Sequence, residues 1–341
     1  MLTTFCDLLS EVQDKAASDA LAARMSPEGG SLSDGGTGAL TYGQATSIYL
    51  AFVIDKMADR NSTMCTWNSS SGGPRATFGR HAIPMVWHYP EVNPFATMTG
   101  NYSTALKNVV ASIKDLPCNA AVTVSQNDAM TVGHPENVLV CTRFPYYKAI
   151  GYAHLSDFFY IWMRRSLKPI FHELFNQMVT SKEELTTVGQ YFDRAQQDCE
   201  QEYKEKLQIV TDKLFKSSNP DYPGLLFYEY HKADRTAMFS SEDLLETPWE
   251  AFTESLIRSG FAISAVWATR SEAYSEKADG TRVLVVVRKQ EKTEQTTRRG
   301  FITILKRELP DKLNTLFCAG VDEEDKEICA IGAGLSVFSR Y

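Results

Sequence analysis

The feature that most constrains the fold is a strand-length apolar run toward the C-terminus, residues 282–287, which is nearly all valine after Arg282. Valine is β-branched and fits the pleated surface of a strand. An unbroken apolar run of this length is typical of a strand that is buried on both faces. We therefore expect a sheet with this strand inside it and other elements packed over it.

The rest of the chain supplies elements of both kinds. Apolar spacing predicts helices at 1–25, 41–60, 103–113, 155–167 and 247–259, and strands at 120–125, 138–141, 224–230 and 261–268. Residues 182–216 are expected to form a long charged helix or a pair of helices. Pro248 and Gly260 mark the two ends of the last helix, and Ser156 or Asp157 is expected to cap the helix at 155–167. The element order predicts an α/β fold with a mixed sheet that has an antiparallel edge.

Composition limits the class of protein. The chain has 341 residues, is 43% hydrophobic and carries a net charge of −7, which is typical of a globular protein and argues against coating nucleic acid by charge alone. Its seven cysteines never form a C-x-x-C pair, and its six histidines lack metal-ligand spacing, so we expect reduced thiols and no metal site. With no long apolar run and no signal pattern, we expect a cytoplasmic protein without membrane contact.

A turn follows the strand predicted at 138–141. Residues 142–147 read Thr-Arg-Phe-Pro-Tyr-Tyr, and a helix is expected about ten residues later. In open α/β sheets, ligands bind where a strand ends and the chain turns toward a helix. This turn offers aromatic faces, backbone carbonyls and a cation, Arg143, but no nucleophile.

Three other regions contain candidate ligand contacts. Arg75, Arg80 and Trp87 lie in a loop-rich aromatic segment and could contact a phosphate backbone and a base. The alternative is that Trp87, Tyr89 and Phe95 fix a long loop to the core. The cluster of Arg164, Arg165 and Lys168 is a further candidate DNA contact. Asp128, after the strand predicted at 120–125, could bind a cofactor hydroxyl or amine, or could be a turn residue.

A larger pattern is a resemblance to a known family. The segment 142–167, TRFPYYKAIGYAHLSDFFYIWMRRSL, resembles the motif region of the large adenine-specific DNA methylases, which are S-adenosylmethionine-dependent DNA methyltransferases acting on amino groups. Further likeness lies at 59–61, 77–87, 91–95, 249–261 and 331–341. The chain is similar to the C-terminal half of such an enzyme. The resemblance implies a partial Rossmann-like methyltransferase sheet at 119–341, behind a helical and loop-rich region at 1–118.

The catalytic motif of that family is altered here. Its Asp-Pro-Pro-Tyr tetrad corresponds to Arg143, Phe144, Pro145 and Tyr146. In the family, the carboxylate and a proline carbonyl accept hydrogen bonds from the target amine, and the tyrosine stacks on a flipped-out base. Pro145 and Tyr146 can keep these roles. Arg143 cannot accept a hydrogen bond, and its charge opposes the positive charge that develops on the attacked amine.

The glycine-rich cofactor loop of the family is also missing. The nearest substitute, residues 93–101, has one glycine and follows no apolar strand. S-adenosylmethionine is therefore expected to bind only if a partner chain supplies that loop. Without the strand that carries the loop, the strand before the tetrad would have an unpaired edge. We expect a protein partner to cover it.

Three hypotheses follow. The first is a catalytically degenerate DNA methyltransferase-like subunit that engages DNA, or serves as a scaffold, within a larger complex, such as one that defends against foreign DNA. The second is one half of a split, active adenine methyltransferase. The third is a protein-interaction module without DNA contact, which the acidic net charge favours.

Overall fold

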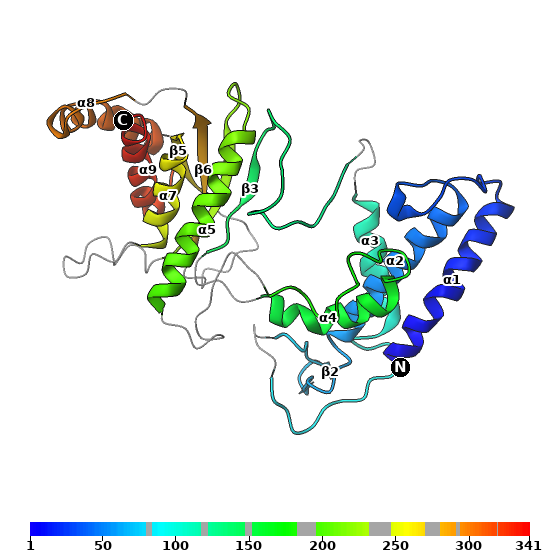
Figure 1. Cartoon of the computed structure of the whole chain (residues 1–341). Coiled ribbons are helices and arrows are strands. Elements are labelled where there is room, and N and C mark those ends of the chain that lie inside the picture. The colour runs from blue at the N-terminus through cyan, green and yellow to red at the C-terminus, as the bar shows by residue number, and fades with distance from the viewer. Residues whose placement is uncertain are drawn as a thin grey trace. The chain divides into compact units, whose positions relative to one another are not determined.

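The computed structural model describes residues 1–79, 84–116, 122–146, 152–182, 196–231, 247–269, 280–290, 294–318 and 320–341. The chain divides into two compact units (Figure 1). Unit 1 comprises Met1–Thr123 and Ile150–Glu184, and unit 2 comprises Val124–Ala149 and Leu185–Tyr341. The segment 150–184 thus belongs to the N-terminal unit. The predicted boundary between residues 118 and 119 placed this segment in the α/β domain instead.

Unit 1 is mainly helical. Its elements are α1 (Leu2–Ala22), the short 3₁₀ helix η1 (Leu32–Asp34), α2 (Ala39–Ala58), the two-residue strands β1 (Trp67–Asn68) and β2 (Gly73–Pro74), α3 (Tyr102–Lys114) and α4 (Tyr152–Leu167). The first three long helices confirm the predictions from apolar spacing, because their apolar stripes form one core. Leu9 of α1, Ile54 and Met57 of α2, Ala105 of α3 and Leu167 of α4 are buried in that core.

The prediction that Ser156 or Asp157 caps α4 is wrong. The helix begins at Tyr152, so Ser156 and Asp157 lie inside it. The Asp157 carboxylate instead accepts hydrogen bonds from the Thr180 backbone N–H at 2.9 Å and from Lys182 Nζ at 2.5 Å. Partial burial raises the pKa of Asp157, but the hydrogen bonds from Lys182 and Thr180 outweigh that effect and leave the pKa below its usual range. Asp157 therefore fastens the segment after α4 to the helix.

Unit 2 contains a mixed four-stranded sheet. Its described strands are β3 (Cys141–Arg143), β4 (Gly224–His231), β5 (Phe261–Thr269) and β6 (Gly280–Lys289), in the order β3-β4-β6-β5. β3 and β4 are parallel, and β6 runs antiparallel to both of its neighbours. The α/β fold with an antiparallel edge is therefore confirmed.

The valine-rich strand β6 is central but is not fully buried on both faces, so that expectation is wrong. Val283, Val285 and Val287 are completely buried, whereas Leu284 and Val286 are half-buried. β4 alternates in the same way, with Leu226, Tyr228 and Tyr230 buried. Since side chains alternate across a strand, one face of the sheet packs into the core and the opposite face is only partly covered.

Helices cover the buried face. Two of these helices are α5 (Gln196–Ser217) and α7 (Pro248–Arg258). Three more elements follow the sheet in the chain: α8 (Arg298–Cys318), the 3₁₀ helix η3 (Glu323–Asp325) and α9 (Lys326–Phe338). In α7, Thr247 Oγ1 accepts from the Glu250 N–H while Glu250 Oε2 accepts from the Thr247 N–H. This capping box and the first-turn proline confirm the predicted start of α7. The tail helices α8 and α9 were not predicted from the sequence.

The helix α9 protects one edge of the sheet (Figure 1). Ser339, just after α9, accepts a hydrogen bond from the Ile263 backbone N–H at 2.8 Å through its hydroxyl oxygen and donates to the Ile263 carbonyl at 3.3 Å. Both backbone groups belong to β5, which has one strand neighbour among the described residues. A helix along an edge strand satisfies groups that would otherwise template pairing with other chains.

Two strand predictions need correction. Residues 122–125 form no strand, and Val122 and Val124 are exposed. The strand predicted at 138–141 lies further along the chain, at Cys141–Arg143, and Val138 makes only an isolated parallel bridge with Ser218. The shift follows from pairing, because a strand extends where a neighbour offers backbone groups in register. Within the part of the chain that is described, no helix is long and apolar enough to cross a membrane.

Candidate functional site

The candidate site lies where β3 and β4 end. These strands are parallel, with Arg143 beside Phe227 in the register, so their carboxyl ends meet at the same edge of the sheet. Side chains from both ends gather there: Arg143 at the end of β3, Tyr146 just after it, and Glu229 and His231 at the end of β4. We refer to these four residues as the strand-end cluster.

Arg143 is paired with an acid. Its Nη2 donates to Glu229 Oε2 at 3.0 Å. The Arg143 side chain is 57% exposed and that of Glu229 is 23% exposed. An ion pair so close to solvent contributes about 0–1 kcal/mol to stability. The main effect of Arg143 on the site is therefore to place a cation where the resemblance implied a carboxylate, with a carboxylate next to it.

Phe144 is part of the core and does not face a ligand. It is 3% exposed, its ring centroid lies 5.0 Å from that of Phe252, and its N–H donates to the Phe227 carbonyl at 2.9 Å. The next carbonyl, of Pro145, accepts a hydrogen bond from the Tyr203 hydroxyl at 3.3 Å. A carbonyl oxygen has a second lone pair, so Pro145 keeps the capacity to accept a further bond.

Tyr146 is half-buried and contacts an imidazole. Its ring centroid lies 4.0 Å from that of His231, with 37° between the planes. His231 Nε2 in turn lies 3.8 Å from Glu229 Oε1. His231 thus lies between the aromatic ring and the carboxylate. Tyr146 also contacts the buried Tyr228, with ring centroids 6.4 Å apart, and packs against the core of unit 2.

Glu229 and His231 were missed by the sequence analysis. The strand at 224–230 was predicted, but nothing in its local pattern pairs Glu229 with a residue 86 positions earlier. Alternation along the strand gives a weak signal, since Glu229 interrupts an aromatic and apolar run. The cluster combines a hydrogen-bond donor, an acceptor and a stacking ring, which is chemistry for recognising a planar polar ligand.

Asp128, expected as a cofactor contact at a strand end, lies in a turn. Its Oδ1 accepts from the Met130 N–H at 2.9 Å, and its carbonyl accepts from the N–H groups of Thr131 and Val132. These bonds are typical of an aspartate that stabilises its own turn. The preceding residues form no strand, so the geometry supports the turn role that was the alternative.

The loop candidates belong to unit 1. Arg75 is exposed beside β2, and Trp87 is 85% exposed. Tyr89 and Phe95 are also exposed, so these rings do not fix the loop to the core as the alternative proposed, although Phe95 contacts Phe5 at a centroid distance of 6.1 Å. Arg80 lies outside the described residues.

The basic residues at the end of α4 mostly hold unit 1 together. Arg164 Nε donates to the Phe175 carbonyl at 3.2 Å. Arg165 donates through Nε and Nη2 to Asp7 Oδ1, at 3.0 and 2.7 Å, and so joins α4 to α1. Lys168 is half-buried. Of the three, Arg165 is exposed, but its guanidinium is already neutralised by Asp7.

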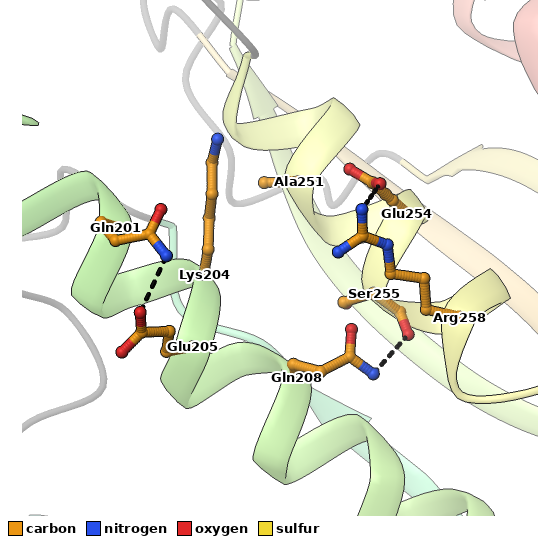
Figure 2. A pocket seen from close by; sticks show the side chains of 8 residues that line it. All are labelled: Gln201, Lys204, Glu205, Gln208, Ala251, Glu254, Ser255 and Arg258. Carbon is orange, nitrogen blue, oxygen red and sulfur yellow. Dashed lines mark hydrogen bonds and ion pairs between the residues drawn. The ribbon is translucent and has the colours of Figure 1, made fainter.

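A groove of about 360 Å³ lies between α5 and α7 in unit 2 (Figure 2). Gln201, Lys204, Glu205 and Gln208 line it from α5, and Ala251, Glu254, Ser255 and Arg258 line it from α7. Arg258 pairs with Glu254 on the same helix, and Gln201 donates to Glu205 at 2.8 Å. Because Arg258 and Glu205 are each bound to a neighbour one helical turn away on their own helix, this part of the groove has the character of a solvated helix surface.

Two candidate contacts for S-adenosylmethionine, Asp128 and the segment 93–101, have local structural roles. Asp128 is engaged in its own turn, and the segment 93–101 leads into α3, where Asn101 caps the helix by accepting from the Thr104 N–H at 2.6 Å. No group of three or more acidic, histidine or cysteine side chains that could hold a metal ion occurs among the described residues. Comparisons with protein families, with curated proteins and with solved structures find no match for this chain.

Proposed function

We propose that the chain is a DNA methyltransferase-like subunit with a degenerate catalytic turn, which engages DNA as part of a larger complex. The observation that carries this proposal is the position of Arg143. It ends a sheet strand beside a second parallel strand, next to a half-buried tyrosine and a proline carbonyl. This is where an amino-methyltransferase of the resembled family would need its catalytic carboxylate.

The charge of Arg143 argues against catalysis of methyl transfer. An attacked exocyclic amine gains positive charge in the transition state, and a guanidinium at that place raises the barrier. The Glu229 carboxylate lies in the cluster, but it is already paired with Arg143 at 3.0 Å. We therefore assign the strand-end cluster to base binding without methyl transfer.

Calorimetry with S-adenosylmethionine tests the catalytic part of this proposal. The purified chain is expected to give no binding heat, and Arg143→Asp is expected to give none either, because the substitution restores a carboxylate but no cofactor loop. Clear micromolar binding by the unmodified chain would contradict the proposal. Circular dichroism of both proteins controls for folding.

A second function, one half of a split active methyltransferase, is favoured by the free edge of β3. In the described sheet, β3 has a strand neighbour on one side only, and Cys141 and Arg143 are exposed there. β3 differs in this respect from β5, where the backbone groups of Ile263 bond to Ser339 just after α9. An open strand edge favours pairing with another chain, and a partner strand would complete the sheet.

Two observations would separate these functions. Co-expression with a partner that carries a glycine-rich cofactor loop should yield methylated DNA if the enzyme is split. Maleimide labelling tests the shared edge directly, because Cys141 lies on β3 and Cys318 is exposed on α8. Loss of Cys141 labelling with retention of Cys318 labelling in the complex supports a partner on β3, and equal labelling of both excludes one.

DNA engagement itself is tested by the salt dependence of binding. A chain that contacts phosphates loses affinity steeply as the salt concentration rises. A chain that shows no DNA binding at low salt would leave only the protein-interaction function. The proposal therefore requires measurable, salt-sensitive binding of single-stranded or duplex DNA.

A further inference from the structure

The N-terminal half of α8 presents cations to solvent around an exposed apolar side chain. Arg298, Arg299 and Lys306 are exposed, and none of them forms an ion pair within the part of the chain that is described. Residues three and four positions apart are neighbours on a helix surface. Arg298 and Arg299 therefore lie one turn before Ile302, and Lys306 lies one turn after it. Ile302 is itself 41% exposed.

Folding of α8 does not account for these cations. The N-terminus of a helix carries partial positive charge, so basic side chains are unfavourable in the first turn. Arg298 and Arg299 occupy that turn, and α8 has no acidic residue there to offset them. The whole chain carries a net charge of −7. A group of unpaired cations on one helix is therefore a local exception that stability does not explain.

An apolar surface adjoins the cations. The ring of Phe301, the residue before Ile302, contacts the Phe338 ring at a centroid distance of 5.6 Å, and Phe338 at the end of α9 is 49% exposed. α8 and α9 pack against each other (Figure 1). Apolar side chains bordered by charged ones are the usual composition of a protein–protein interface. We refer to Arg298, Arg299, Ile302, Lys306 and Phe338 as the α8 patch.

The acids around the α8 patch do not neutralise it. Glu308 Oε1 pairs with Arg307 at 3.2 Å, and Glu308 Oε2 pairs with Arg340. The hydrogen bond from Arg340, more than the one from Arg307, lowers the pKa of Glu308. Glu308 is thus shared between two cations. Glu294 precedes the helix and Asp311 lies beyond its first half, and both are exposed. Cations outnumber acids over this surface.

The composition of the α8 patch selects among partners. A second copy of the chain that bound through the same patch would bring like charges together. Nucleic-acid phosphates would pair with the cations but would leave Ile302 and Phe338 without apolar contacts. A protein segment with carboxylates on one side and apolar side chains on the other complements both parts of the patch.

We infer that the α8 patch docks an acidic amphipathic segment of a partner protein. Apolar side chains of that segment cover Ile302 and Phe338, and its carboxylates pair with the cations that surround them. The inference goes beyond the proposed function, because it requires neither DNA binding nor the strand-end cluster. It gives the chain a protein-docking surface on the tail helices of unit 2.

Fluorescence anisotropy with a synthetic peptide tests the inference. The probe is a fluorescently labelled amphipathic helix with leucine on one face and glutamate on the other. One control peptide has glutamine in place of every glutamate, and a second has alanine in place of every leucine. The full chain is expected to bind the probe about ten-fold more tightly than either control, because each control lacks one of the two kinds of contact.

Matched variants test the residues of the α8 patch. Lys306→Glu should weaken binding of the probe about ten-fold, because attraction becomes repulsion. Lys107→Glu makes the same change at an exposed position on α3 and should leave binding unaltered. Ile302→Ser should also weaken binding, whereas Ile161→Ser, on α4 at a position that is 58% exposed, should not. Circular dichroism confirms that each variant folds.

The opposite results overturn the inference. Absence of probe binding does so, and so does equal affinity for the probe and either control peptide. Equal weakening by Lys306→Glu and Lys107→Glu would show a general effect of net charge and not a docking surface. If duplex DNA binds, the probe does not, and Lys306→Glu weakens the DNA complex, then the α8 patch is a nucleic-acid contact. That last result would leave the proposed function intact.

Discussion

A buried carboxylate in unit 1 gives the sharpest stability prediction. Asp55 lies on α2 between the buried residues Ile54 and Met57, and its Oδ1 is inaccessible and accepts no hydrogen bond within the described chain. Burial raises the pKa of Asp55 from 3.8 to about 7. The nearby Cys6 thiol, whose pKa is also raised by burial, offers no compensating positive charge.

The raised pKa makes stability depend on pH. In the unfolded chain Asp55 loses its proton near its ordinary pKa, whereas in the folded chain it keeps the proton to about pH 7. The folded state therefore binds more protons in this interval, and the free energy of unfolding falls as the pH rises through it. At roughly 1.4 kcal/mol per pKa unit, the difference between 3.8 and about 7 lowers the free energy of unfolding by about 4 kcal/mol above pH 7.

Asp55→Asn removes the titration. The amide carries no charge, so between roughly pH 4 and 8 the variant should lack the part of the pH dependence that Asp55 contributes. Contributions from other groups are the same in the variant and the parent chain. The variant should gain stability relative to the parent as the pH rises, by up to about 4 kcal/mol near pH 8. Any packing cost of the amide is the same at each pH and does not affect this difference.

Hydrogen exchange of α2 peptides in increasing urea measures the effect on unit 1 alone. Asp14→Asn is the control, because it makes the same chemical change at an exposed position on α1. The reasoning is refuted if Asp55→Asn and the parent differ by the same free energy at low and high pH. It is also refuted if Asp14→Asn shows the same pH-dependent gain.

Further predictions concern unit 2. Gly332→Ala on α9 would place a Cβ 2.3 Å from Val266 Cβ and should lower stability by about 1–3 kcal/mol. Gly334→Ala meets no atom within 4 Å and should be neutral or raise stability by up to about 1 kcal/mol, which urea unfolding can compare. Thr247→Ala removes the capping box and should lower the free energy of unfolding by about 1 kcal/mol. An unchanged free energy of unfolding would show that the capping box does not stabilise unit 2. Phe252→Ala removes a ring that contacts Phe144 and Tyr228 and should cost about 3–5 kcal/mol, measured in the same way.

Elements with strong local signals were predicted well. α7 starts and stops where Pro248 and Gly260 indicated, because capping and backbone preferences act within a few residues. α2 and β6 were found for a related reason, since each has a clear apolar pattern. The tail helices α8 and α9 were not predicted, and α8 contains Pro310, a residue that usually interrupts a helix.

The candidate site was only half predicted. The turn at 142–147 identified Arg143 and Tyr146, because a strand end before a proline turn is a local feature. Glu229 and His231 could not be identified, because they reach the turn only through the parallel pairing of β3 with β4. Asp128 was assigned to a strand end that does not form, since Val122 and Val124 found no partner strand among the described residues.

By itself, the sequence determined most of the helices, the strand character of the valine run and the cation in the turn. These follow from side-chain chemistry and from interactions within a few residues. Only the tertiary structure decided that 150–184 belongs to unit 1, that β6 lies between β4 and β5, and that Glu229 faces Arg143. Each of these depends on contacts between residues far apart in the chain, which local propensity does not encode.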